Sequence, residues 1–231
     1  MNISQIRAQF PALQQKVYGK PLVYLDNSAT TQKPESVLEV LREMNGGING
    51  NIHRAVHYLS VACTERYDKA RKTIRDFINA ASENEIIFTA GTTASLNLLA
   101  FSFGQTYVRP GDRIIITQTE HHSNIVPWQM MCQRTGALLE VWEMDDTGAL
   151  DPKKLEQILD KPGDPPKLLA ITHISNVLGI VNPLAEIIRI AHYYQVPVAV
   201  DGAQGIVHQK VDVRQMDADF YVFSGHKLYG P

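Results

Sequence analysis

The sequence has few of the features that would point directly to a partner or a compartment. It contains only two cysteines, Cys63 and Cys132, and they form no close-spaced motif, so neither a disulfide framework nor a zinc ribbon is indicated. Lys and Arg together number 22, against 24 for Asp and Glu. Without an excess of basic charge, nucleic acid and anionic membranes are not expected as partners.

Long apolar runs are missing as well. No stretch approaches the length of a membrane span, and residues 1–10 lack the apolar core of a signal peptide. We therefore expect a cytoplasmic protein. The nucleotide-binding patterns G-x-G-x-x-G and G-x-x-x-x-G-K do not occur either. The 231 residues, 44% of them hydrophobic and 20% charged, are enough for one large globular domain.

Short apolar runs alternate with helical segments along most of the chain. Apolar strands separated by helices predict an α/β fold, with a mostly parallel sheet covered by helices on both faces. We expect residues 1–21 to form an N-terminal helical segment and residues 22–231 to form one large domain. The predicted strands are 22–25, 85–89, 113–117, 138–143, 167–173, 196–200 and 218–223. The predicted helices run from Pro34 toward Met44, along one face from Cys63 to Ile78, from Gly91-Thr92-Thr93, from 120–124 to Gly136, from Asp151-Pro152, and from Asn182-Pro183.

The last predicted strand leads to a lysine of interest. Phe220 to Phe223 are four apolar residues in a row, which predicts a strand buried on both faces, and Lys227 follows closely. Low-dielectric surroundings disfavour an ammonium ion, so such an amine becomes available as a nucleophile, as in Schiff-base lysines. A single lysine of this kind is more often in a solvated loop, and the rest of the chain must decide.

Polar residues gather after the predicted strands. In an open α/β sheet, ligands bind beyond the carboxyl ends of the strands, so these residues are candidates for one shared site. They are Thr92, Thr93, His121, Asn176, Asp201, Gln204, Ser224, His226 and Lys227.

Each candidate has a chemical use and an ordinary alternative. Thr92 and Thr93 place hydroxyl and N–H groups at a helix start, which suits an anion such as phosphate, or simply caps the helix. Ser224 and His226 can reach the same anion from the last strand. Asp201 suits a cationic ring nitrogen, with a helix cap as its alternative.

The remaining candidates suit an aromatic ligand. Gln204 and Asn176 can donate to a phenolate oxygen, and His121 can stack on a ring and carry a proton. Metal binding is the competing use of histidine, but Arg54 stands between His53 and His57 where a metalloprotease needs glutamate. We therefore expect no metal site, and both cysteines are expected to be core thiols.

With these residues assembled, the sequence closely resembles the cysteine desulfurases, fold-type I enzymes that use pyridoxal 5'-phosphate (PLP). It is most similar to the branch of the sulfur-mobilisation (SUF) system, which includes selenocysteine lyases. The motifs extend through nearly the whole chain. They are residues 26–34 (DNSATTQKP), 51–54 (NIHR), 91–93 (GTT), 120–122 (EHH), 172–179 (THISNVLG), 201–204 (DGAQ) and 224–231 (SGHKLYGP).

The resemblance implies a role for each candidate. Lys227 would bind PLP as a Schiff base and shuttle a proton, Asp201 would pair with the pyridine nitrogen, and His121 would stack on the ring. The residues implied to hold the phosphate are Thr92, Thr93, Ser224 and His226. Those implied near the phenolate are Asn176 and Gln204, and those near the substrate are Arg54 and Asn176.

The resemblance also implies an activity. L-cysteine would lose its sulfur to a protein cysteine, giving a persulfide and L-alanine, and a SufE-like acceptor would carry the sulfur toward iron–sulfur cluster assembly. The full-length enzyme would be a homodimer. Alternatives are a selenocysteine lyase, an aminotransferase, an epimerase or a non-catalytic fragment.

Two departures from the family pattern accompany the resemblance. Ala94-Ser95 stand where the family often has Glu-Gly, and we expect only a local effect. The family's persulfide cysteine, carboxylate-binding arginine and C-terminal small domain lie beyond the position of Pro231. We therefore expect this chain to be the cofactor-binding portion of the enzyme.

Overall fold

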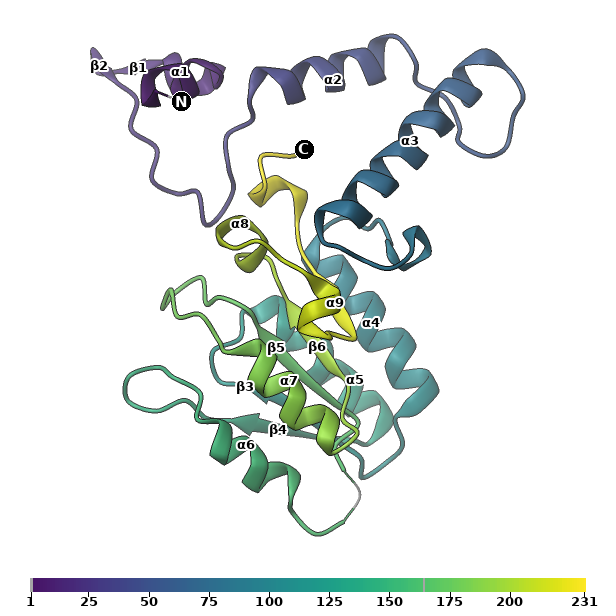
Figure 1. The fold of residues 1–231 in the computed structure, drawn as a ribbon, viewed down its shortest axis with the longest axis vertical. Helices are drawn as coiled ribbons and strands as arrows, with labels where there is room; N and C mark the ends of the chain where they lie inside the picture. The colour runs from purple at the N-terminus through teal and green to yellow at the C-terminus, as the bar shows by residue number, and fades with distance from the viewer. Residues whose placement is uncertain (1, 164) are drawn as a thin grey trace. The chain divides into compact units, whose positions relative to one another are not determined.

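The computed structural model describes residues 2–163 and 165–231. The chain forms two compact units, whose elements are labelled in Figure 1. One unit runs to Ile86 and also takes in Gly225–Pro231, and the other is Ile87–Ser224.

The second unit is built on a five-stranded sheet in which every pairing is parallel. The strand order is β4-β3-β5-β6-β7. The strands are β3 (Arg113–Thr117), β4 (Leu138–Trp142), β5 (Leu168–Thr172), β6 (Val198–Asp201) and β7 (Phe220–Val222).

Helices cover both faces of this sheet (Figure 1). The helices of this unit are α4 (Thr92–Tyr107), η3 (His122–Asn124), α5 (Val126–Thr135), α6 (Pro152–Leu159), α7 (Leu184–Tyr193), α8 (Gly205–His208) and α9 (Val213–Met216). Alternate strand residues point to opposite faces, so Ile115 packs with α6 and α7 while Ile114 and Ile116 pack with α4 and α5.

Local signals explain several of these boundaries. Asp151 caps α6 by accepting a hydrogen bond from the Lys153 N–H at 3.0 Å, with Pro152 in the first turn. Gly136 ends α5 in the left-handed region at φ 76°, where glycine is favoured. These two predicted boundaries are confirmed.

The sheet has a topological switch point between β3 and β5. The strand that follows β3 in the chain, β4, pairs on one side of it, and the next strand, β5, pairs on the other. The connection that leaves β3 runs to β4 on one side, and the connection that leaves β5 runs to β6 on the other. At such a point α/β proteins bind ligands, beyond the carboxyl ends of the two strands.

The first unit contains helices and one small hairpin. β1 pairs antiparallel with β2. No helix in the described part of the chain is long and apolar enough to cross a membrane. The elements of this unit are α1 (Ile3–Ala8), η1 (Pro11–Gln14), β1 (Lys16–Val17), β2 (Lys20–Pro21), α2 (Glu35–Gly46), α3 (Tyr58–Phe77), η2 (Glu83–Glu85) and η4 (Gly225–Lys227).

Three sequence predictions about strands were wrong. Residues 22–25 and 85–89 form no strand, because neither segment pairs with another along its length. β7 is a strand, but Phe220, Tyr221 and Val222 are only half-buried rather than buried on both faces. The reason is that β7 is an edge strand of the described sheet, paired with β6 alone.

The expected cap of α7 was also wrong. Pro183 occupies the cap position, and the Asn182 side chain instead donates to the carbonyl of Thr172 at 2.7 Å. No side-chain hydrogen bond from the described residues caps the start of α7. Cys63 and Cys132 are both buried, as expected of core thiols, and burial raises the pKa of Cys132.

Candidate active site

The start of α4 and the end of β7 together form an anion cradle in the second unit. The Ser224 Oγ accepts a hydrogen bond from the Thr92 N–H at 2.8 Å and lies 2.8 Å from the Thr92 Oγ1. Gly91 precedes them at φ 102°, and a Cβ there would come within 3.2 Å of the Ser224 Oγ. Because Gly91 is the cap residue and offers no side chain, Thr92 and Thr93 are first-turn residues and not caps. Hydroxyl and N–H groups at a helix start are donors of the kind that bind an anion, so this cradle is a candidate anion site.

Asp201 lies at the end of the neighbouring strand. It is buried, and its Oδ1 accepts from the Ala203 N–H at 2.9 Å. It is paired in register with Val222, two residues before Ser224. Alternation along β6 places it on the same face as Ala199, the face that α4 and α5 cover. A buried carboxylate and the anion cradle thus lie at adjacent strand ends.

Two glycines allow bulky side chains to approach the segment after Asp201. A Cβ on Gly202 would lie 2.1 Å from the Tyr221 ring, and one on Gly205 would lie 2.1 Å from the His173 Nδ1. That nitrogen is 3.0 Å from the Tyr221 hydroxyl. Burial lowers the pKa of His173, and burial together with the charge of Asp201 raises the pKa of Tyr221. Both groups are therefore neutral near neutral pH.

His121 begins the turn that follows β3. Its side chain is exposed, and its Nδ1 accepts a hydrogen bond from the Ser123 N–H at 3.2 Å, with the Ser123 Oγ 2.8 Å away. A nitrogen that accepts from a backbone N–H carries no proton, so the neutral ring holds its proton on Nε2. The donor of the ring, the Nε2 N–H, thus points away from the turn that His121 begins.

Glu120, which had no assigned role in the sequence, sits at the switch point. It is only 8% exposed, and its Oε1 accepts from the Thr172 N–H at 2.8 Å and from the Thr117 hydroxyl. Its Oε2 accepts from the Asn124 Nδ2 at 2.6 Å. Burial raises the pKa of Glu120 to about 8, against the effect of these hydrogen bonds, and the charge of Asp201 raises it further.

The segment that carries Lys227 belongs to the first unit. The His226 carbonyl accepts from the Thr31 N–H at 3.0 Å and from the Thr31 Oγ1 at 2.9 Å, and that Oγ1 accepts from the Tyr229 N–H at 2.9 Å. The His226 Nδ1 is 3.2 Å from the Thr30 Oγ1. Burial lowers the pKa of His226, and the charges of Lys227 and Lys33 lower it further. Thr30 and Thr31 therefore fix the backbone around the lysine.

The remaining predicted residues differ in exposure. In the second unit, Gln204 is buried, whereas Asn176 lies on an exposed turn and Thr93 is exposed in the first turn of α4. Arg54 is exposed in a loop of the first unit, and Lys227 is half-buried in η4. Of the predicted set, the structure brings Thr92 and Ser224 into direct contact and places Asp201 beside them.

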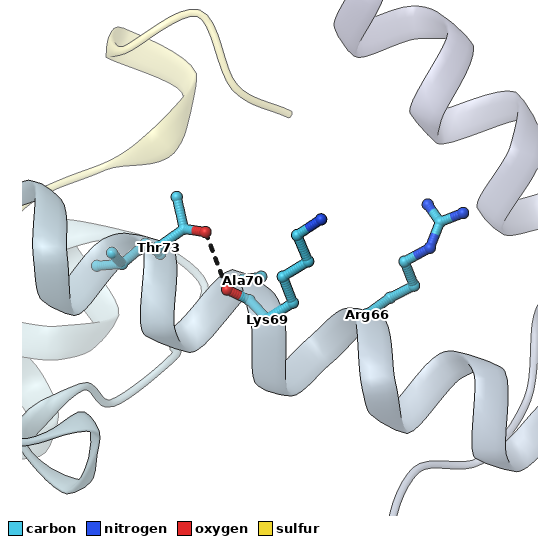
Figure 2. A pocket seen from close by; sticks show the side chains of 5 residues that line it. Arg66, Lys69, Ala70 and Thr73 are labelled. Carbon is cyan, nitrogen blue, oxygen red and sulfur yellow. Dashed lines mark hydrogen bonds between the residues drawn. The ribbon is translucent and has the colours of Figure 1, made fainter.

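No three His, Cys, Asp or Glu side chains gather as metal ligands among the residues that the structure describes. A shallow hollow does run along one side of α3 (Figure 2). None of the predicted site residues lines it. Its lining residues are Arg66, Lys69, Ala70, Thr73 and Ile74.

The sequence matches the family described as aminotransferase class-V over residues 23–231. The chain belongs to the aminotransferase class-V family. A cysteine desulfurase of Shigella sonnei (strain Ss046) is 50% identical to this class-V chain over 230 residues, covering 100% of the chain and 56% of the relative.

Solved structures of similar proteins share the fold. The cysteine desulfurase CsdA (S-sulfonic acid) from Escherichia coli matches with a TM-score of 0.87 and 41% identity, covering 100% of this chain and 56% of that one. A mutant of C-DES with glycine covalently linked to its PLP cofactor matches with a TM-score of 0.81 and 25% identity, covering 96% and 55%. The predicted α/β fold of the fold-type I large domain is confirmed, and the class-V chain spans about half the length of these relatives.

Proposed function

We propose that this chain is the cofactor-binding portion of a PLP-dependent cysteine desulfurase. The observation that carries the proposal is the buried Asp201 next to the Thr92–Ser224 cradle. A phosphate needs hydroxyl and N–H donors, and a pyridinium needs a carboxylate, so these residues fit the two ends of PLP. The names of the relatives support the same function.

The proposed roles follow from the chemistry of each side chain. Thr92, Thr93, Ser224 and His226 would bind the phosphate, and Asp201 would hold a proton on the ring nitrogen. Gln204 and Asn176 would donate to the phenolate oxygen, with Asn176 and Arg54 near the substrate. Lys227, three residues after Ser224, would supply the covalent amine. His121 would stack on the ring and deliver a proton from Nε2.

When bound, PLP supplies an electrophilic aldehyde and an electron-withdrawing ring. The proposed substrate is L-cysteine and the proposed products are L-alanine and a protein persulfide. A SufE-like acceptor, a homodimeric full-length enzyme of the SUF type and a cytoplasmic location complete the proposal. The family resemblance supports them.

The test is covalent trapping on this chain. Adding PLP should give the visible absorption band of a Schiff base, and borohydride reduction should leave a pyridoxyl group on Lys227, found by peptide mapping. Lys227→Ala should abolish the band, and the exposed Lys153→Ala should not. A label elsewhere, or none, would overturn the proposal and favour a non-catalytic fragment.

A second assay separates the related enzymes. The complete gene product should release alanine from L-cysteine with sulfur left on the protein or its acceptor. Release of a keto acid would indicate an aminotransferase. Alanine formation from selenocysteine but not from cysteine would indicate a selenocysteine lyase.

A further inference from the structure

Glu120 is a buried carboxyl group at the point of the sheet where α/β proteins bind ligands, and none of the roles proposed above uses it. Its Oε1 joins the end of β3, through the Thr117 hydroxyl, to the end of β5, through the Thr172 N–H. Thr172 is paired in register with Asp201 on β6. The Glu120 side chain therefore ties together the ends of β3 and β5 at the switch point, beside the end of β6.

The other oxygen of Glu120 closes the turn that carries His121. Its Oε2 accepts from the Asn124 side chain at 2.6 Å, and the Asn124 N–H donates to the His121 carbonyl at 2.7 Å. The Asn124 Oδ1 in turn accepts from the Trp128 Nε1 at 2.9 Å, on α5. His121 thus lies inside a short loop that is closed on both sides and anchored to a buried indole.

We propose that Glu120 is a positioning residue for His121, holding the turn that aims the imidazole by tying it to the ends of β3 and β5. The inference rests on the proposed function in one respect only, namely that the ligand on which His121 acts is PLP. With the turn closed, the His121 backbone has one conformation, and the Ser123 N–H stays on the Nδ1. The loop therefore fixes which ring nitrogen carries the proton.

The hydrogen-bond pattern makes a sharp test possible. Above its pKa of about 8, the Glu120 carboxylate accepts at both oxygens. In Glu120→Gln the amide has one acceptor oxygen, yet both the Thr172 N–H and the Asn124 Nδ2 donate at this position. In either orientation of the glutamine amide, one of its N–H groups faces another N–H donor. The turn that carries His121 therefore loses a hydrogen bond and loosens. Adding Asn124→Asp restores the pattern, because the new carboxylate accepts from both the glutamine amide and the Trp128 Nε1.

The measurement is the tautomer of His121 by ¹⁵N NMR in the cofactor-free chain, at mildly alkaline pH, with the signal assigned through His121→Gln. The wild type should show one tautomer, with Nε2 protonated. Glu120→Gln should lose that signature, and Glu120→Gln/Asn124→Asp should regain it. If Glu120→Gln does not fold, Asn124→Ala opens the same loop and should show the same loss.

Asn182→Ala is the matched control. It removes another buried hydrogen bond to Thr172 without touching the His121 turn. It should lower stability and leave the His121 tautomer unchanged. An unchanged tautomer in Glu120→Gln, a double variant that fails to restore it, or an equal loss in Asn182→Ala would each overturn the inference.

A second readout uses PLP affinity in a double-mutant cycle. If Glu120 acts through His121, then Glu120→Gln should weaken PLP binding several-fold in the wild type but not further in His121→Gln. Additive losses would mean that Glu120 acts by another route and would overturn the inference. A wild-type chain that binds no PLP while the NMR arm succeeds overturns the proposed function alone.

Discussion

The two units of this chain differ in how they bury their apolar residues. In the second unit the central strands β3, β5 and β6 are almost fully buried between two layers of helices. In the first unit, α1 and α2 bury none of the residues described in them, and α3 buries only Ser60 and Cys63. The second unit therefore has an apolar core of its own, whereas polar contacts carry more of the order in the first.

The largest expected effect tests this contrast with matched leucines. Leu169→Ala, on β5, should cost about 2–5 kcal/mol of unfolding free energy, because a fully buried leucine leaves a cavity. Leu59→Ala, on α3, should cost less than about 1 kcal/mol, because the Leu59 side chain is already 37% exposed.

Urea unfolding followed by tryptophan fluorescence measures the unfolding free energy of both variants. The chain has two tryptophans, Trp128 and Trp142, and both are buried in the second unit, so the signal reports that unit. Equal losses of unfolding free energy in the two leucine variants would show that the two units unfold as one. The difference in burial between them would then not produce a difference in stability.

The next effect concerns the pH dependence of the second unit. The pKa of Glu120 is raised to about 8 in the folded chain, above that of an unfolded glutamate. Between pH 4.5 and 8 the folded state thus holds a proton that the unfolded state has lost, and stability falls as pH rises. The slope attributable to Glu120 should approach about 1.4 kcal/mol per pH unit.

The comparison that isolates this slope is wild type against Glu120→Gln. The lowered pKa of His173 acts in the opposite direction in both proteins, so it cancels in the difference. Urea titrations followed at several pH values give the two slopes. Parallel curves would mean that Glu120 does not hold the extra proton.

The smallest effect belongs to the first unit. Thr31→Val removes the hydroxyl that donates to the His226 carbonyl and accepts from the Tyr229 N–H, at a cost of about 1 kcal/mol. Hydrogen exchange at the Tyr229 amide should speed up several-fold, while the tryptophan-detected midpoint stays unchanged. A shift of that midpoint would show that the polar contacts of the first unit also support the second.

Sequence patterns predicted the strands of the second unit from residue 113 onward and the long helices of both units, α2 and α3 included. Buried parallel strands are short apolar runs between helices, and from residue 113 onward each predicted strand is present within a few residues. Residues 22–25 and 85–89 have the same apolar character but no pairing partner, and strand formation depends on pairing as well as on composition.

The candidate site was partly predictable for a similar reason. Thr92, Asp201 and Ser224 could be found in the sequence, because each is a polar residue next to a glycine just after a predicted strand. Glu120 and Thr31 stood in quoted motifs, but their roles depend on contacts with Thr172 and His226, which are remote in sequence. Such pairings are invisible in a single sequence.

The hydrogen bond from Thr31 to the His226 carbonyl also has a consequence for how much of the chain must be present before it can form. The two residues are 195 positions apart. Every strand of the five-stranded sheet lies between them in the sequence. The hydrogen bond that holds the lysine segment therefore needs almost the whole chain, and a chain that ends at residue 225 would contain all five strands but would leave the Thr31 hydroxyl without its His226 partner.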